Sequence, residues 1–366
     1  MSDTAKVLKE PLFQIEKRDK DSIPWWKKWL IRIIAVASAL VVCGIITFLV
    51  IGENPFRVYA VMFEGTLGSE RRIWNLLQNT AILLGVSLAV TPAFKMRFWN
   101  IGAEGQVLMG ALGAVACVFY LGGKIDNTLL LLLMLVVSML FSCIWAVIPA
   151  IFKAKWNTNE TLFTLMMNYI AMQLVSFFLA VWVKNGSGVL GVLKHGHLPE
   201  LFNGWLLNIL IVAVVTALMY IYLKFTKQGY EISVVGESEN TARYVGINVK
   251  KVIIRTLLIS GLVAGIAGFI LVAGVHHTID PNTVGGQGFT AIMVSWLGNF
   301  NPLYMVGTSF FVTFLDQGAA EISTVYGLSK AFPDIIVGII FFFIIGSEFF
   351  IHYIVKFRKK KQGVQK

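Results

Sequence analysis

The sequence predicts an all-α, polytopic membrane protein with about ten transmembrane helices. Of its 366 residues, 57% are apolar and only 14% are charged, whereas about 25% of the residues of an ordinary soluble protein are charged. The mean hydropathy is +0.73, and the apolar residues gather in runs near the length, about 20 residues, that a bilayer-spanning helix needs. These observations leave no room for a water-soluble domain of ordinary size between the spans.

Helices are expected where apolar runs stand between charged residues and turn residues. The expected spans, in chain order, are 30–51, 73–94, 99–121, 128–152, 161–183, 205–225, 253–275, 287–300, 302–319 and 332–352. The eighth and ninth are short, and the segment from Gly298 to Pro302 between them predicts a tight turn. Proline disfavours helical geometry in the residue before it, which separates the two spans.

The distribution of Lys and Arg predicts the orientation of the chain. With the N-terminus inside, 24 of the 31 basic residues lie on the cytoplasmic side and 7 lie outside. The positive-inside rule therefore places both termini in the cytoplasm, in a multi-pass protein of the cell membrane. The predicted domains are a cytoplasmic segment over 1–29, a transmembrane domain over 30–355 with a cytoplasmic loop at about 227–252, and a basic cytoplasmic tail over 356–366.

On this topology, spans two to five begin outside and spans seven to ten begin inside. The two sets run in opposite senses, as an inverted repeat requires. The segments that would mark such a repeat are Gly102-Ala103-Glu104-Gly105-Gln106 and Gly285-Gly286-Gln287-Gly288. Two short Gly/Gln matches also arise by chance in a glycine-rich protein, so both explanations stay open at this point.

Polar side chains inside the spans are the candidate functional residues. A charged side chain at the centre of a membrane helix costs about 2.5–3.5 kcal/mol, so intramembrane ionisable groups default to a functional hypothesis. Asn100 and Glu104 lie four residues apart, hence on one helix face, and Gln106 follows them. We expect these three to line a substrate pathway. The structural alternative is close packing at the neighbouring glycines, with Glu104 capping the start of a helix.

Two further polar stripes have the same helical spacing. Glu160, Thr164 and Asn168 in the fifth span rise about 12 Å along one face at about 1.5 Å per residue. Asn75 and Asn79 form a similar pair in the second span. Each stripe has to face protein or water, so it predicts either a lined pathway or an interhelical hydrogen bond, which contributes about 0.6 kcal/mol on average in membranes.

The full set of pathway candidates also includes one glutamine and one aromatic residue from the eighth span. The tryptophan is included because an indole can stack on a planar ligand, although packing is the commoner role of an aromatic residue. The candidates are Asn79, Asn100, Glu104, Gln106, Thr164, Asn168, Gln287 and Trp296.

No metal site, cofactor site or catalytic site is expected in this chain. His276, His277 and Asp280 lie in an outer loop without further ligands at helical spacing. The three cysteines lie in apolar runs, where they act as small hydrophobes. A G-x-x-x-x-G-K-[ST] loop and a plausible catalytic constellation are both missing from the sequence. The net charge of +11 sits beside membrane spans, so it predicts contact with membrane lipid and not with nucleic acid.

The one long polar loop on the inner side runs from about Lys227 to Lys251. Ser238 is an N-cap candidate for a short helix that Gly246 would end. Such a helix at the inner surface offers a docking site to another protein; the alternative is an interfacial helix that rests on lipid. The residues predicted to couple to a partner are Glu239, Asn240, Ala242, Arg243, Tyr244, Gly246 and Ile247.

Three segments carry a resemblance to a known family. Residues 99–106, WNIGAEGQ, resemble the FNIGAEGQ signature of permease subunits in ABC importers of the branched-chain amino acid and simple-sugar/nucleoside group. Residues 158–160 with 165–171, TNE and LMMNYIA, and residues 242–248, ARYVGIN, resemble two further stretches of that group. The resemblance runs in order over about 75–345, and the nucleoside branch fits best because GAEGQ and MMNY are typical of it. Trp99, Leu162, Thr241 and Val245 depart from the usual residues, and Trp99 adjoins the signature.

The resemblance implies a transmembrane subunit that pairs with a second permease, a paralogue. It also implies a separate cytoplasmic ATPase that uses ATP and docks on the 236–248 loop, and an extracellular substrate-binding lipoprotein that delivers the cargo. No Lys or Arg lies in the middle of a span, which favours a neutral cargo such as a nucleoside over a nucleotide. The alternatives are a simple-sugar or branched-chain amino acid permease, a proton-coupled transporter in which Glu104 or Asp316 binds the proton, and a membrane scaffold.

Overall fold

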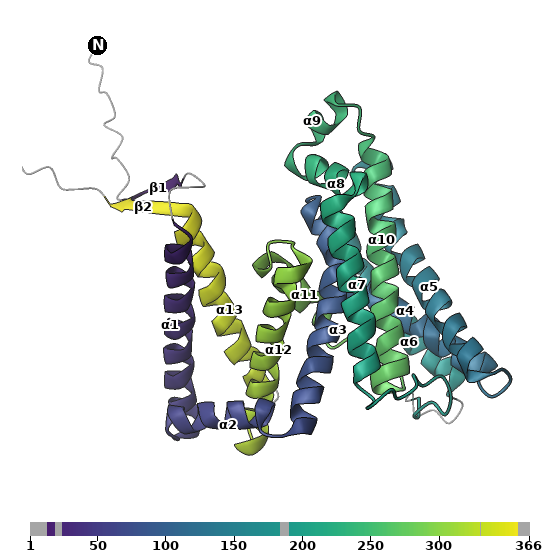
Figure 1. Ribbon diagram of the computed structural model, residues 1–366, viewed down its shortest axis with the longest axis horizontal. Helices are drawn as coiled ribbons and strands as arrows, with labels where there is room; N and C mark the ends of the chain where they lie inside the picture. Colours follow the sequence, from purple (N-terminus) through teal and green to yellow (C-terminus); the bar gives the residue numbers. More distant parts are fainter. Residues whose placement is uncertain (1–12, 19–23, 184–189, 330, 358–366) are drawn as a thin grey trace, which may run out of the picture. The chain divides into compact units, whose positions relative to one another are not determined.

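The computed structural model describes residues 13–18, 24–183, 190–329 and 331–357 (Figure 1). Most of the expected 1–29 segment and 356–366 tail therefore lies outside the described residues. The elements are β1 (Phe13–Lys17), α1 (Trp25–Ile51), α2 (Pro55–Leu67), α3 (Glu70–Lys95), α4 (Ala103–Leu121), α5 (Asn127–Trp156), α6 (Glu160–Trp182), α7 (Leu206–Phe225), α8 (Lys227–Glu237), α9 (Glu239–Tyr244), α10 (Val249–Ile270), the π-helix η1 (Leu271–His276), α11 (Gln287–Leu297), α12 (Pro302–Val325), α13 (Ala331–His352) and β2 (Tyr353–Phe357).

The predicted all-α membrane fold is confirmed. Among the described residues, 8 helices are long and apolar enough to cross a membrane. They are α1, α3, α4, α5, α6, α7, α10 continued by η1, and α13. Each coincides with one of the expected spans, so the apolar runs alone located these helices. The short antiparallel pair of β1 and β2 and the helices α2 and α8 were not expected.

The expected eighth and ninth spans differ from the other eight. α11 covers the eighth and has 11 residues, which is about 16 Å of helix at about 1.5 Å per residue and too short for a hydrocarbon core of about 30 Å. α12 covers the ninth and has 24 residues, but it is not among the 8 helices that are apolar enough. The predicted tight turn is confirmed, because α11 ends at Leu297 and α12 begins at Pro302.

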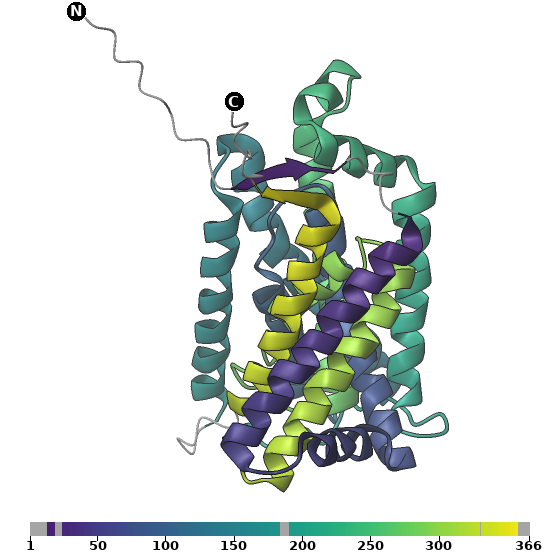
Figure 2. The same ribbon diagram turned by 90° about the vertical axis from the view of Figure 1, so that its left-hand side faces the viewer.

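The chain forms two compact units, which are described separately. The first comprises Met1–Thr66 and Leu315–Lys366, and the second comprises Leu67–Phe314. In the first, α1 and α13 lie side by side (Figure 2). Arg32 of α1 bonds Glu348 of α13 at 2.6 Å, with both side chains about one-third exposed. An ion pair near the helix ends joins this helix pair without placing a charge at its centre.

The second unit is built around three buried helices. In α3, α4 and α10, 67–72% of the most apolar stretch is buried, whereas only 22% of that stretch is buried in α5. α10 packs against α3, α4 and α5 (Figure 1). The N-terminus of α4 and the C-terminal part of α3 lie in this core, so the polar groups at these positions are buried.

Two glycines on α10 allow its close packing. A β-carbon on Gly265 would lie 2.6 Å from the Cα of Met139 on α5, and one on Gly268 would lie 2.5 Å from the carbonyl oxygen of Val107 on α4. The Ser138 hydroxyl donates to the Gly265 carbonyl at 2.7 Å. Small residues that bring backbones into contact are the usual device for helix packing in membranes.

We expect Gly265→Val to destabilise the second unit strongly. The added side chain would have to occupy space held by backbone atoms of α5. We therefore expect a loss of folding stability larger than the value of about 1–3 kcal/mol that is typical of added volume in a packed core. The thermal midpoint of the solubilised protein measures this effect. Gly307→Val on α12 is the matched control, since no atom lies within 4 Å of a β-carbon there. Equal midpoints for the two variants would contradict the packing account.

Candidate functional site

The N-terminus of α4 lies inside the second unit, where its backbone N–H groups need partners other than water. Asn100 supplies one, because its Oδ1 accepts from the Gly102 N–H at 3.1 Å. Two residues of α6, one helical turn apart, supply two more. Thr164 Oγ1 accepts from the Ile101 N–H at 3.2 Å, and Asn168 Oδ1 accepts from the Gly105 N–H at 2.8 Å.

Asn168 holds α6 against the start of α4 through both ends of its amide. Its Nδ2 donates to the Ile101 carbonyl at 2.9 Å, while its Oδ1 accepts from Gly105. A β-carbon on Gly105 would lie 3.0 Å from the Asn168 Cα. Glycine at this position therefore allows the close approach that the hydrogen bonds require.

Asn100 and Gln106 complete a buried amide network. Gln106 Nε2 donates to Asn100 Oδ1 at 3.2 Å, and Asn100 Nδ2 lies 3.4 Å from Gln106 Oε1 and 3.5 Å from Ser260 Oγ. All three side chains are at most 1% exposed. Ser260 on α10, whose hydroxyl donates to the Ala89 carbonyl at 2.6 Å, was not predicted. Thr256 and Ser260 have the same four-residue spacing as the other polar stripes, and that spacing is the signal that could have identified it.

Glu104 joins two helix N-termini. Its Oε1 accepts from the Gly286 N–H at 2.8 Å and its Oε2 from the Gly288 N–H at 2.7 Å, and it is 3% exposed. Gly286 is the N-cap of α11 and has φ +78°. A β-carbon on Gly288 would collide with the Glu104 backbone nitrogen. We call Glu104 with Gly286 and Gly288 the Glu104 junction.

The Glu104 junction has a simple electrostatic basis. A helix N-terminus carries about half a positive charge, and an acceptor on its free N–H groups is stabilising. Glu104 lies in the first turn of α4 and binds the first N–H groups of α11. One buried carboxylate therefore compensates both termini, and neither of its oxygens is left without a donor. The two Gly/Gln segments of the sequence are the segments that meet here.

The structure brings five of the eight pathway candidates together around the start of α4: Asn100, Glu104, Gln106, Thr164 and Asn168. Gln287 lies beside the Glu104 junction, and its Oε1 is buried with no hydrogen-bond partner among the described residues. Asn79 is half-buried on α3. Trp296 lies near the other end of α11, is 53% exposed and contacts Trp99 with ring centroids 5.8 Å apart.

A second polar cluster in the same unit was not predicted. The Gly274 carbonyl in η1 accepts from Asn208 Nδ2 at 3.0 Å and lies 3.4 Å from Gln78 Nε2. A π-helical turn leaves a carbonyl without its usual partner, and such turns are frequent at functional sites. Gln78 adjoins the Asn75–Asn79 stripe, but the π-helix that gives it a partner has no signal in the sequence.

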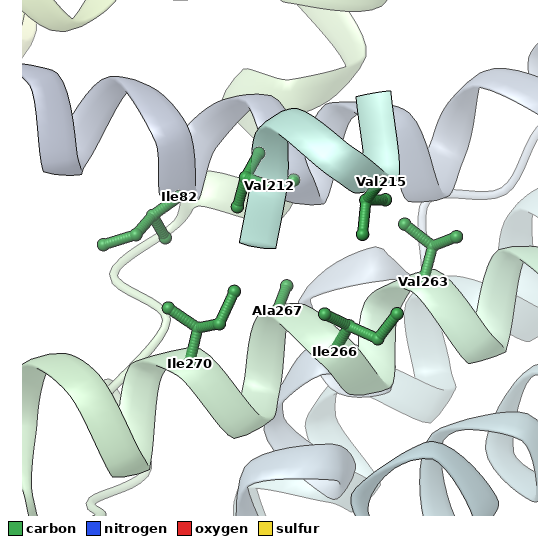
Figure 3. A pocket seen from close by; sticks show the side chains of 8 residues that line it. Ile82, Val212, Val215, Val263, Ile266, Ala267 and Ile270 are labelled. Carbon is green, nitrogen blue, oxygen red and sulfur yellow. The ribbon is translucent and has the colours of Figure 1, made fainter. Parts of the chain in front are cut away.

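One small cavity lies between α3, α7 and α10 (Figure 3). It measures about 10 Å³ and is lined by apolar side chains, among them Ile82, Val212 and Ile270. A water molecule needs about 10–15 Å³ and two or more polar partners, so this cavity is dry. Within the described residues, no three His, Cys, Asp or Glu side chains lie close enough together to hold a metal ion.

The predicted short helix is confirmed as α9. Ser238 is its N-cap and accepts from the Thr241 N–H at 3.2 Å. Gly246 follows its C-terminus with φ +81°, a conformation that favours glycine. Within the helix, Arg243 pairs with Glu239 at 3.3 Å.

α9 presents an exposed face with two large side chains. Tyr244 is 91% exposed and Val245 is 63% exposed. Glu239, Asn240, Arg243 and Gly246 are also exposed and Ile247 is partly so, whereas Ala242 is 0% exposed. Ala242 therefore packs beneath the helix instead of facing a partner. These exposed side chains leave this face of α9 accessible to a partner.

α8 connects α9 to the buried helices, in a segment where the sequence had predicted only a polar loop. A β-carbon on Gly236 of α8 would collide with the Lys95 carbonyl at the end of α3. Glu231 of α8 binds Arg255 of α10 at 2.8 Å. α8 therefore contacts both α3 and α10, the helices whose residues Ala89 and Ser260 adjoin the amide network.

Comparison with known proteins places these features in a family. Residues 72–345 match the family described as "Branched-chain amino acid transport system / permease component". A glucose ABC transporter permease of Haloferax volcanii is 27% identical and covers 96% of each chain. A guanosine ABC transporter permease of Bacillus subtilis is 26% identical over 91% of this chain and 97% of its own. A nucleoside ABC transporter permease of Lactococcus lactis is 26% identical over 87% and 91%.

Proposed function

The chain belongs to the branched-chain amino acid transport system / permease component family, and we propose that the cargo of this ABC permease is a nucleoside. As a permease it is a multi-pass transport component and not an enzyme. In this proposal a separate cytoplasmic ABC ATPase uses the ATP, a paralogous permease completes the membrane part, and an extracellular substrate-binding lipoprotein delivers the cargo. The chain itself binds no cofactor, and both of its termini are cytoplasmic.

Two relatives carry the nucleoside proposal, because their names specify guanosine and nucleosides. The alignment with this chain covers at least 91% of the length of each relative. The polar groups of the second unit agree with a neutral cargo. The buried side chains at the start of α4 are amides and hydroxyls, and the one carboxylate among them is bound on both oxygens. The candidates outside this bonded network include the amides Asn79 and Gln287, and amide side chains suit ribose hydroxyls and base edges.

Glucose is the second candidate, and a specific observation favours it. The Haloferax volcanii relative covers 96% of this chain and is named for glucose. A hexose and a ribose present the same hydroxyl groups, and they differ in the base that a nucleoside adds. Trp296 with Trp99 offers an exposed aromatic pair that a base could stack on.

The mechanism in this proposal starts at α9. Closure of the ATPases pushes α9, and α8 transmits the push to α3 and α10 through Gly236 and the Glu231–Arg255 pair. The Glu104 junction holds α11 to α4, so these two helices move together as one rigid body. The pathway then opens alternately to the two sides along the remaining candidates, Asn79, Gln287 and Trp296.

An uptake panel tests the cargo. Cells with and without the chain receive radiolabelled guanosine, adenosine, uridine, ribose, glucose and leucine. We expect removal of the chain to abolish uptake of one or more nucleosides and to leave leucine uptake unchanged. Loss of glucose uptake alone would replace the nucleoside proposal with the sugar alternative. Uptake that survives ATP depletion and stops with the proton gradient would support the proton-coupled alternative instead.

A further inference from the structure

A cavity of about 410 Å³ lies where α3 and α7 end and α8 begins, against the turn between α11 and α12. Lys95 from α3 and Lys224 from α7 line it, together with Tyr220 and Tyr230. Asn301, from the turn between α11 and α12, lies on its wall as well. The volume is within the about 300–1,000 Å³ range of small-molecule sites. None of the residues around the start of α4 lines this cavity.

The two lysines give the cavity a positive charge without a matching carboxylate. Lys95 Nζ lies 3.5 Å from the Leu223 carbonyl, and Lys224 Nζ lies 2.8 Å from the Tyr220 hydroxyl and over the rings of Tyr220 and Phe225, so the contacts of both are uncharged groups. Among the described residues, no Asp or Glu lines the cavity. The carboxylate of Glu231 on α8 is held by Arg255 at 2.8 Å. An anionic ligand would therefore supply the negative charge that Lys95 and Lys224 do not receive from the protein.

The place of the cavity indicates the source of that charge. Lys95 is the last residue of α3, and Lys224 is in the last turn of α7. Both helices are long and apolar enough to cross a membrane. Their ends therefore lie at the level of lipid headgroups, where tyrosine side chains are also enriched. Basic pockets between membrane helices at this level bind anionic headgroups.

We propose that this cavity binds the phosphodiester headgroup of an anionic phospholipid. The ammonium groups of Lys95 and Lys224 pair with the phosphate oxygens, and the side chains of Ser233 and Asn301 offer hydrogen bonds to the rest of the headgroup. The acyl chains leave along the exposed faces of the spanning helices. None of the eight pathway candidates lines this cavity, and the inference does not depend on which substrate is carried.

Binding of a labelled phosphatidylglycerol to the purified full-length chain in phosphatidylcholine nanodiscs tests the proposal. We expect Lys95→Gln/Lys224→Gln to weaken binding about 30-fold. Each lysine near an anionic membrane surface contributes about 1 kcal/mol of binding free energy, and the loss of both corresponds to this change. Lys27→Gln/Lys28→Gln removes the same charge at the start of α1 and should leave binding unchanged. Lys95→Arg/Lys224→Arg should bind as the wild type does.

Two results would overturn the proposal. One is undiminished phosphatidylglycerol binding in a correctly folded Lys95→Gln/Lys224→Gln variant. The other is displacement of the lipid by millimolar inorganic phosphate, which would assign the site to a free anion. Should the double variant fail to fold, Lys224→Gln alone serves, because Lys224 is exposed; its expected loss is about fivefold, and unchanged binding would contradict the proposal.

Discussion

Glu104→Ala is expected to abolish transport and to destabilise the second unit more than any other substitution of a single polar side chain. The change leaves the N–H groups of Gly286 and Gly288 buried without acceptors. Each buried donor that loses its partner costs about 1–3 kcal/mol, so the expected loss is about 2–6 kcal/mol. It also removes the negative charge that compensates the N-termini of α4 and α11.

The measurements are the thermal midpoint of the purified protein and the uptake of labelled cargo by cells. We expect uptake to fall to the level of cells without the chain. Glu104→Gln retains one acceptor oxygen and should lie between the alanine variant and the wild type in thermal midpoint. Glu200→Ala is the control, because Glu200 is an exposed glutamate in the link before α7. Wild-type stability and uptake in the Glu104→Ala protein would show that the junction has no structural role.

Replacing Arg243–Gly246 by a Gly-Ser segment of equal length is expected to abolish both ATPase association and transport, with normal membrane insertion. The segment contains the most exposed side chain of α9, Tyr244, and Val245 beside it. Tyrosine is one of the residues that dominate binding energy at protein interfaces. Insertion is unaffected because the segment lies outside the 8 candidate spans.

A single substitution sharpens this test. Tyr244→Ala should weaken ATPase binding about 30-fold, as expected for an interface residue that contributes about 2 kcal/mol. The matched control is Phe202→Ala, an aromatic residue that is 93% exposed in the link before α7. Co-purification of the ATPase with each tagged variant measures the effect. Equal recovery with Tyr244→Ala and with the wild type would exclude Tyr244 as a docking residue.

Much of the fold follows from local properties of the sequence. Apolar runs located the 8 candidate spans, and cap chemistry located α9, because Ser238 and Gly246 act within a few residues of the helix that they limit. α2 and α8 were missed because each is short and has too few apolar residues for a span. α11 was taken for a span because it is apolar, although its 11 residues are too few.

The candidate site was predictable as a set of residues but not as an arrangement. Helical spacing placed Thr164 and Asn168 on one face, and the structure confirms that both face α4. The partner of Glu104 could not be found in this way, since Gly286 is 182 residues away in the chain. Such a contact depends on how whole helices pack. The sequence signal that did exist was the pair of Gly/Gln segments.

In the proposed function, α9 transmits work from a separate ATPase to the helices that carry the cargo. Reconstitution tests it most directly, with the complex recovered through a tag on this chain and placed in proteoliposomes. We expect labelled guanosine to accumulate only when ATP and Mg²⁺ are supplied, and Tyr244→Ala to reduce both accumulation and ATP hydrolysis. Accumulation driven by a proton gradient without ATP, or by a preparation that contains no ATPase, would contradict it.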